Sequence, residues 1–120
     1  MANKKALVVD DDPINRKLIA ASLKKEGFTC IESGNGVEAF SELEKEDIDI
    51  ILLDIVMPVM DGVEFLKEIK VNPKYINLPI IVLTTDDSRK TEVLSLGADD
   101  IIIKPVKPVE LIEKIKTYLP

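Results

Sequence analysis

Four short runs of almost purely apolar residues, separated by stretches long enough for a helix, narrow the folds that this chain can adopt. They are ALVV (6–9), IDIILL (48–53), PIIVL (79–83) and DIII (100–103). A strand with one solvated face alternates apolar and polar residues, whereas a strand buried on both faces is apolar throughout. A weaker fifth run, FTCI (28–31), is interpreted as an edge strand. The runs therefore predict a parallel sheet that is covered on both faces.

The segments between these runs have the spacing and the end signals of helices. Asp12 and Pro13 predict an N-cap and a first helical residue, and Gly27 predicts the end of that helix. Asp61 followed by Glu64 resembles a capping box at the start of the third helix. The apolar stripes are expected from Ile14, Leu18, Ala20, Ala21 and Leu23, then Val37, Phe40 and Leu43, then Val63, Leu66 and Ile69, and finally Leu111, Ile112, Ile115 and Leu119.

The fourth helix is expected over 88–96, ending at Gly97, and the fifth is expected to start at Pro108. Strands and helices then alternate from one end of the chain to the other. Such alternation predicts the α/β class, with a doubly wound parallel sheet, right-handed crossovers and helices on both faces. With 120 residues and no linker, the chain is expected to form a single domain over 1–120.

The charge balance excludes some functions. Net charge is −6, with 22 acidic against 16 basic residues, which disfavours direct binding of nucleic acid or of anionic membranes. No run has the length of a membrane span or a signal peptide, so no membrane insertion and a cytoplasmic location are expected. The single cysteine, Cys30, cannot form an internal disulfide and is interpreted as a small core residue.

Polar side chains that can bind a ligand or take part in a reaction follow four of the five predicted strands. In open α/β sheets, ligands bind beyond the carboxyl ends of the strands. Taken singly, each of these side chains has a structural interpretation, such as a helix cap or a solvated lysine. Asp54 is the exception, because it interrupts an apolar run and buried acids need a partner or a metal. Together they predict a site at one edge of the sheet, formed by Asp10-Asp11-Asp12, Asp54, Thr84-Thr85 and Lys104-Pro105.

These motifs, LVVDDDP, LLDIVMPVMDG, IIVLTT and the Lys-Pro of IIIKP, resemble those of response-regulator receiver domains, the CheY-like family of two-component signalling. The resemblance covers about 5–119. It implies a five-stranded flavodoxin-like (βα)5 fold with strand order 2-1-3-4-5. Asp54 would then lie between Asp10 and Asp11 on one side and Thr84 on the other. Lys104 would start two strands away, on the order of 10 Å, and lean back toward Asp54.

Carboxylates crowded at one edge repel each other by on the order of 3 kcal/mol per pair, and a hard cation relieves this repulsion. Oxygen ligands without histidine suit Mg²⁺. The resemblance implies that Asp11 and Asp54 bind the ion directly, that the carbonyl of Val56 is a further ligand, and that Asp10 positions ligand water. It implies that Asp54 is the nucleophile that forms an acyl phosphate, with Thr84 and Lys104 contacting the phosphoryl group. It also implies a cis Lys104–Pro105 peptide.

The resemblance further implies a signalling switch rather than an enzyme, since such a domain catalyses only its own phosphorylation and dephosphorylation. The phosphodonor would be a sensor histidine kinase or a histidine phosphotransfer protein, and the output a downstream effector protein. Val56 and Asp86 would tune hydrolysis. The output face would be the fourth helix, fifth strand and fifth helix, including Arg89, Lys90, Ile101, Val106 and Lys107. Ile101 departs from the aromatic residue common in the family, so the usual aromatic readout is not expected.

Three other functions are compatible with a fold of this class. A flavin-binding module would need a phosphate-binding loop after the first strand, where this chain has DDDP. A haloacid-dehalogenase-type phosphatase needs a second aspartate two residues after the nucleophile; Val56 follows Asp54 at that spacing, and Asp12 follows Asp10 but is interpreted as a cap. A degenerate receiver would act as a phosphorylation-independent docking module. Because no output domain follows the fifth helix, the chain is interpreted as a stand-alone receiver or as a receiver excised from a longer protein. Three roles stay open: at a flagellar motor, as a phosphorelay intermediate, or as a partner of a separate effector.

Overall fold

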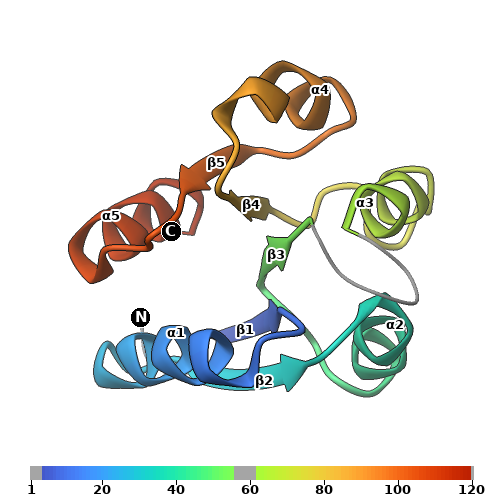
Figure 1. The fold of residues 1–120 in the computed structure, drawn as a ribbon. Coiled ribbons are helices and arrows are strands. Elements are labelled where there is room, and N and C mark those ends of the chain that lie inside the picture. The colour runs from blue at the N-terminus through green and yellow to red at the C-terminus, as the bar shows by residue number, and fades with distance from the viewer. Residues whose placement is uncertain (1–3, 56–61, 120) are drawn as a thin grey trace.

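A computed structural model describes residues 4–55 and 62–119, within which strands and helices alternate as the sequence predicts (Figure 1). The strands are β1 (Lys5–Val9), β2 (Thr29–Ser33), β3 (Ile50–Asp54), β4 (Ile80–Thr84) and β5 (Asp100–Ile103). The helices are α1 (Pro13–Lys25), α2 (Gly36–Lys45), α3 (Gly62–Lys70), α4 (Lys90–Ser95) and α5 (Pro108–Tyr118), with a 3-10 turn at Asp87–Arg89. In these two ranges, no helix combines the length and apolarity needed to cross a membrane.

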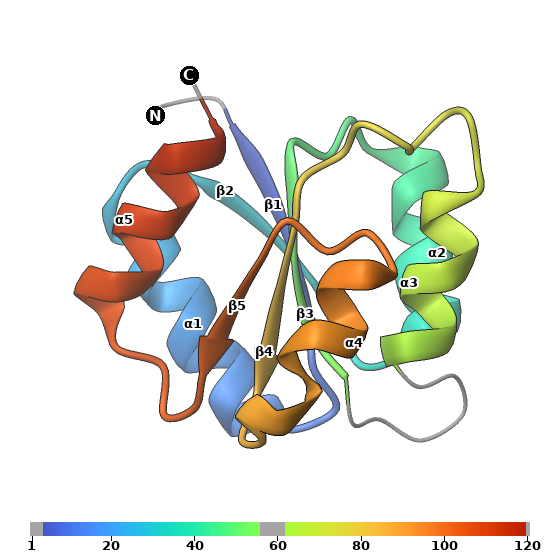
Figure 2. The same ribbon diagram turned by 90° about the horizontal axis from the view of Figure 1, so that it is seen from above.

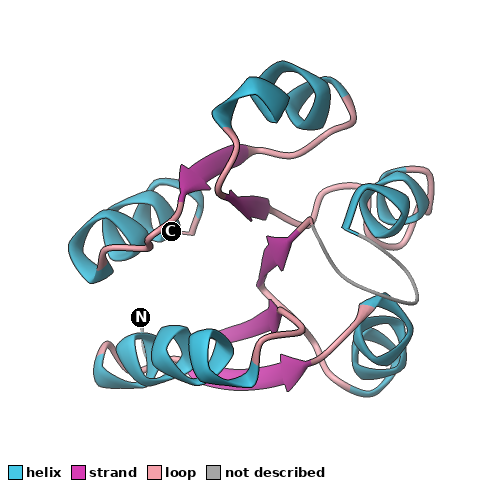
Figure 3. Ribbon diagram, viewed as in Figure 1, coloured by secondary structure: helices cyan, strands magenta, loops and turns pink. Residues whose placement is uncertain are grey.

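All five strands are parallel and lie in the order β2-β1-β3-β4-β5, which confirms the expected doubly wound sheet (Figure 3). Helices α1 and α5 cover one face, and α2, α3 and α4 cover the other (Figures 1 and 2). The chain leaves β1 toward β2 on one side and reaches β3 on the other side. The strand order therefore reverses between β1 and β3, which is where such sheets bind ligands.

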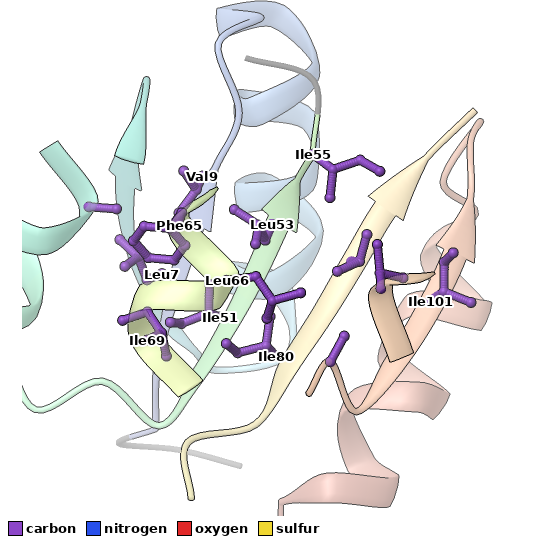
Figure 4. Close-up of a cluster of buried hydrophobic side chains, with 14 of the residues drawn as sticks. Leu7, Val9, Ile51, Leu53, Ile55, Phe65, Leu66, Ile69, Ile80 and Ile101 are labelled. Atoms are coloured by element: carbon purple, nitrogen blue, oxygen red, sulfur yellow. The ribbon is translucent and has the colours of Figure 1, made fainter. Parts of the chain in front are cut away.

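The core consists of two apolar clusters on opposite faces of the sheet, because successive side chains of a strand point to opposite faces. Leu7, Val9 and Leu53 belong to the cluster beneath α2, α3 and α4, where Figure 4 shows them beside Phe65. Ala6 belongs to the cluster beneath α1 and α5. Every residue of β3 and β4 is buried, which explains why their sequences are apolar without alternation.

The predicted core-facing stripe of α1 is wrong in part. Ile14 and Leu18 are 73% and 65% exposed, whereas Ile19, Ala20 and Leu23 face the core. At about 100° per residue, Ile14 and Leu18 lie on the side of the helix opposite to Ile19 and Leu23. The helix is thus apolar on two faces, and periodicity alone could not tell which one packs on the sheet. In α2, likewise, Val37 is exposed and Ala39 is buried.

The predicted ends of α1 and α4 are confirmed. The Asp12 carboxylate accepts hydrogen bonds from the N–H groups of Ile14 (3.0 Å) and Asn15 (3.4 Å), and Pro13 occupies the first helical position. Beyond α4, Gly97 has φ of +110°, a conformation that favours glycine. A Cβ there would also overlap the aliphatic chain of Lys70. The capping box that involves Asp61 lies outside the described residues.

Ser33, the last residue of β2, carries a buried hydroxyl that has no hydrogen-bond partner among the described residues. An unsatisfied buried hydroxyl loses its hydration on folding without compensation. We expect Ser33→Ala to raise the free energy of unfolding by about 1 kcal/mol, measured by urea denaturation followed by circular dichroism. Ser22→Ala, at a site where the hydroxyl is bonded to the carbonyl of Leu18, serves as the control. Loss of stability in Ser33→Ala would contradict this expectation.

Candidate functional site

Asp10 and Asp54 lie at the carboxyl ends of the neighbouring strands β1 and β3. Val9 pairs with Leu53, so the two aspartates occupy the next positions along their strands. Asp10 is fully buried and Asp54 is 6% exposed, while Asp11 is exposed. Carboxylate oxygens from the three aspartates, one from each, all lie within 4.8 Å of one another. The predicted acidic cluster therefore exists in the folded chain.

Thr84 and Lys104 approach this cluster from the other side. Thr84 ends β4 and is buried, and its carbonyl accepts a hydrogen bond from the N–H of Lys104 (2.7 Å). The Lys104 Nζ lies 3.3 Å from Asp54 Oδ2 and 3.7 Å from Asp10 Oδ2. The long lysine side chain thus reaches across β4 from β5, as expected. The peptide between Lys104 and Pro105 is cis, as expected also.

Every hydrogen-bonding group of the buried Asp10 has a protein partner. Its N–H donates to the carbonyl of Ser33 (3.0 Å), and its own carbonyl accepts from Arg16 Nη1 (2.8 Å). Its Oδ1 accepts from the N–H of Asp12 (2.9 Å), and its Oδ2 from Asn15 Nδ2 (2.6 Å). These bonds offset the cost of burying a carboxylate. Asn15 and Arg16 were not identified from the sequence, because only the packing of α1 against β1 reveals that they contact Asp10.

Arg16 also ties α1 to β2 through Glu32. The Arg16 Nε lies 3.1 Å from Glu32 Oε1, and Lys17 Nζ lies 3.5 Å from the same oxygen. Burial acts to raise the pKa of the Glu32 carboxyl, but the hydrogen bond from Arg16 and the charge of Lys17 outweigh it and lower the pKa. The segment after β1 is thereby anchored to the neighbouring strand.

The loop after β4 holds the Thr84 hydroxyl. Its Oγ1 accepts a hydrogen bond from the N–H of Asp86 (3.1 Å). The Asp86 carboxylate in turn accepts from Oγ (2.6 Å) and N (2.9 Å) of Ser88, and these two bonds lower the pKa of the Asp86 carboxyl. Because its oxygen accepts from the backbone, the Thr84 hydroxyl can donate its own hydrogen to a bound group.

On β5, Ile101 is buried in the cluster beneath α2, α3 and α4 (Figure 4), whereas Ile103 is 40% exposed. Ile103 and Ile101 line a hollow between α4 and α5, together with Lys90 and Lys107. Asp87 and Glu110 line the same hollow, so the predicted output face combines apolar side chains with charges of both signs. Val56, the predicted carbonyl ligand, lies outside the described residues.

The donor set fits a magnesium ion. Three carboxylates and the single ammonium of Lys104 give the cluster a formal charge of about −2, which one divalent cation balances. The chain contains no histidine, and hard oxygen ligands favour Mg²⁺ or Ca²⁺ over softer metals. Asp11, Asp54 and Asp10 are therefore able to hold such an ion at the edge of the sheet.

Comparisons with solved structures give the same fold. The chemotaxis protein CheY4 of Vibrio cholerae superposes with a TM-score of 0.91 at 32% identity, covering 98% of this chain and 100% of that one. The response regulator TrrA of Thermotoga maritima, in complex with Mg²⁺ and BeF, gives a TM-score of 0.88 at 35% identity, covering 97% and 99%.

Sequence comparisons give the same result. The phosphate regulon transcriptional regulatory protein PhoB of Pseudomonas aeruginosa is 36% identical over 121 residues, which cover 99% of this chain and 53% of PhoB. The chain spans about half the length of the curated relatives it matches first. The response regulator receiver domain profile matches residues 6–116. The chain therefore belongs to the response regulator receiver domain family of two-component systems.

Proposed function

We propose that this receiver domain accepts a phosphoryl group on Asp54 in a Mg²⁺-dependent reaction, and that phosphorylation changes its binding to an effector protein. One observation carries the proposal: the Lys104 Nζ lies 3.3 Å from Asp54 Oδ2, beside the cluster of three aspartates. The complex of the related TrrA with Mg²⁺ and BeF supports the same chemistry here.

Each residue at the sheet edge has a separate task. An oxygen of the Asp54 carboxylate attacks the phosphorus of a phosphohistidine, the P–N bond breaks, and an acyl phosphate forms. The Lys104 ammonium neutralises charge on the transferred phosphoryl group, and the Thr84 hydroxyl donates a hydrogen bond to one of its oxygens. Water later hydrolyses the acyl phosphate, which resets the switch. The domain thus catalyses only its own phosphorylation and dephosphorylation.

Asp11 and Asp54 would hold Mg²⁺ through their carboxylates, with Asp10 positioning a ligand water and the Val56 carbonyl adding a ligand. Bound there, the ion supplies the positive charge that lets an anionic carboxylate meet an anionic phosphodonor. The hydrogen bonds that the buried Asp10 carboxylate accepts offset the hydration that it loses on burial.

The partners follow from this chemistry. A sensor histidine kinase or a histidine phosphotransfer protein in the cytoplasm would donate the phosphoryl group. The output surface would be α4, β5 and α5, where Lys90, Lys107 and Ile103 line one hollow. Ile101 is already packed in the core, so we expect the readout to come from movement of the loop after Thr84 rather than from an aromatic side chain.

The competing functions fit the geometry less well. The carboxylate cluster would repel a flavin phosphate. Asp12 caps α1, which leaves a phosphatase mechanism at Asp10 without its general acid. A docking module that works without phosphorylation would not need Lys104 and three aspartates brought together.

The test is intact mass after incubation with Mg²⁺ and a small acyl-phosphate donor. We expect one added phosphoryl group in the natural protein and none in Asp54→Asn, which has lost its nucleophilic carboxylate. Prior addition of a metal chelator should prevent the addition. Asp87→Asn, at an exposed acid outside the cluster, serves as the matched control and should be phosphorylated normally. An adduct that persists in Asp54→Asn would mean that another residue accepts the phosphoryl group. No adduct in the natural protein, even with beryllofluoride as a stable mimic, would favour the docking module.

A further inference from the structure

We propose that Asn15 is a positioning residue: its side-chain amide holds the carboxylate of Asp10 in the orientation that the divalent cation requires. This inference rests on the proposed function, because it concerns the affinity of the same acidic site for Mg²⁺. It assigns a task to a residue in the first turn of α1 that belongs to none of the motifs at the strand ends.

The contact is short and its direction is unambiguous. Asn15 Nδ2 lies 2.6 Å from Asp10 Oδ2. An ionised carboxylate can only accept hydrogen bonds, so the nitrogen of the amide, and not its oxygen, must face it. A hydrogen bond to a charged acceptor is stronger than one between neutral groups. Asn15 is half-buried, so solvent screens this contact only in part.

With both carboxylate oxygens engaged, Asp10 cannot rotate freely. The N–H of Asp12 holds Oδ1, and the amide of Asn15 holds Oδ2. A carboxylate offers about four lone-pair sites, so each oxygen keeps one for the cation or its water. Arg16 donates to the main-chain carbonyl of Asp10, whereas Asn15 contacts its side-chain carboxylate.

Asn15 also governs where the Lys104 ammonium rests. Lys104 Nζ is closer to Asp54 Oδ2 (3.3 Å) than to Asp10 Oδ2 (3.7 Å), although Asp10 is the more deeply buried acid. The amide of Asn15 donates a hydrogen bond to Asp10 Oδ2 and so weakens the attraction between that oxygen and the Lys104 ammonium. Without that donor, the buried oxygen would draw Lys104 away from Asp54.

A purely structural task for Asn15 is a poor explanation. Asp12 already caps α1, and alanine has a higher helix propensity than asparagine. Asn15→Ala should therefore leave the helix intact and remove only the contact to Asp10. The substitution separates positioning from folding.

The experiment is an NMR titration of Mg²⁺ without phosphodonor, following the amide resonances of Asp11 and Asp54. We expect Asn15→Ala to weaken Mg²⁺ binding by about tenfold, the lower end of the effect seen when an outer-shell partner at a metal site is lost. Asn15→Gln keeps an amide donor and should recover most of the affinity. Ser22→Ala, two turns along the same helix, should bind Mg²⁺ as the natural protein does.

The outcomes separate this inference from the proposed function. Equal Mg²⁺ affinity in Asn15→Ala and the natural protein would overturn the positioning of Asp10 while leaving phosphorylation of Asp54 intact. Failure of the natural protein to bind Mg²⁺ would overturn both. Weakened binding in Asn15→Ala together with widespread shifts beyond α1, or no recovery in Asn15→Gln, would also count against positioning, since either would indicate a disturbed fold.

Discussion

Gly62→Ala is expected to destabilise the domain by about 3 kcal/mol, the upper end of the usual cost of overpacking. Gly62 begins α3, and its N–H donates to the carbonyl of Ile55 (3.0 Å). A Cβ at this position would overlap the Asp54 carbonyl oxygen and the Ile55 Cα. Both atoms belong to the backbone at the end of the central strand, which is hydrogen-bonded on both sides and cannot yield as a flexible side chain would.

Urea denaturation followed by circular dichroism measures the change. Gly34→Ala is the matched control, because a Cβ there meets only the flexible side chains of Glu38 (3.6 Å) and Arg16 (3.7 Å). We expect the control to alter the free energy of unfolding by less than about 0.5 kcal/mol. The carboxylate of Asp54 lies on the displaced segment, so Gly62→Ala should also slow phosphorylation. Near-natural stability of Gly62→Ala would mean that α3 moves away from β3 at little cost.

The strands were predictable because burial on both faces leaves a clear mark in the sequence. The predicted runs ended at Leu53 and Leu83, and the observed strands extend one residue further, to Asp54 and Thr84. Asp54 and Thr84 therefore still belong to the hydrogen-bonded sheet, in which Asp54 pairs with Leu83. The strand order, in contrast, followed from the resemblance, since right-handed crossovers alone allow more than one order of five strands.

The contacts around Asp10 could not be predicted in the same way. Asn15 reaches Asp10 across the turn between β1 and α1, and whether it does so depends on which face of α1 packs against the sheet. That face was uncertain because Ile14 and Leu18 make the opposite side equally apolar. Sequence motifs identify residues that are chemically unusual, whereas positioning residues such as Asn15 are recognised by geometry.

Lys104→Met is expected to move two properties of the site in opposite directions. Methionine is unbranched and uncharged, so it keeps much of the bulk and removes the ammonium. Phosphorylation from a small acyl-phosphate donor should slow by about a hundredfold or more, because a group that stabilises the charge of the transferred phosphoryl is lost. Mg²⁺ should bind more tightly, since the ammonium that competes for the oxygens of Asp54 and Asp10 is gone.

The tighter binding follows from charge. A unit charge and a divalent ion about 5 Å apart repel by on the order of 6 kcal/mol at an effective dielectric of 20, and solvent reduces this for a side chain that is one fifth exposed. We expect Mg²⁺ affinity to rise by about tenfold in an NMR titration. Lys107→Met, at an exposed lysine that makes no ion pair with the cluster among the described residues, controls for the change in net charge and should alter neither property.

Stability supplies an independent measurement on the same variant. In chelator, Lys104→Met should unfold more easily than the natural protein, because the buried Asp10 and Asp54 lose their shared cation. Saturating Mg²⁺ should reverse most of this loss, since a ligand that binds the folded state stabilises it in proportion to its affinity. If Mg²⁺ instead bound more weakly to Lys104→Met, the lysine would be helping to assemble the cation site rather than competing with the ion for its carboxylates, and the phosphorylation defect would then reflect a lost metal ion.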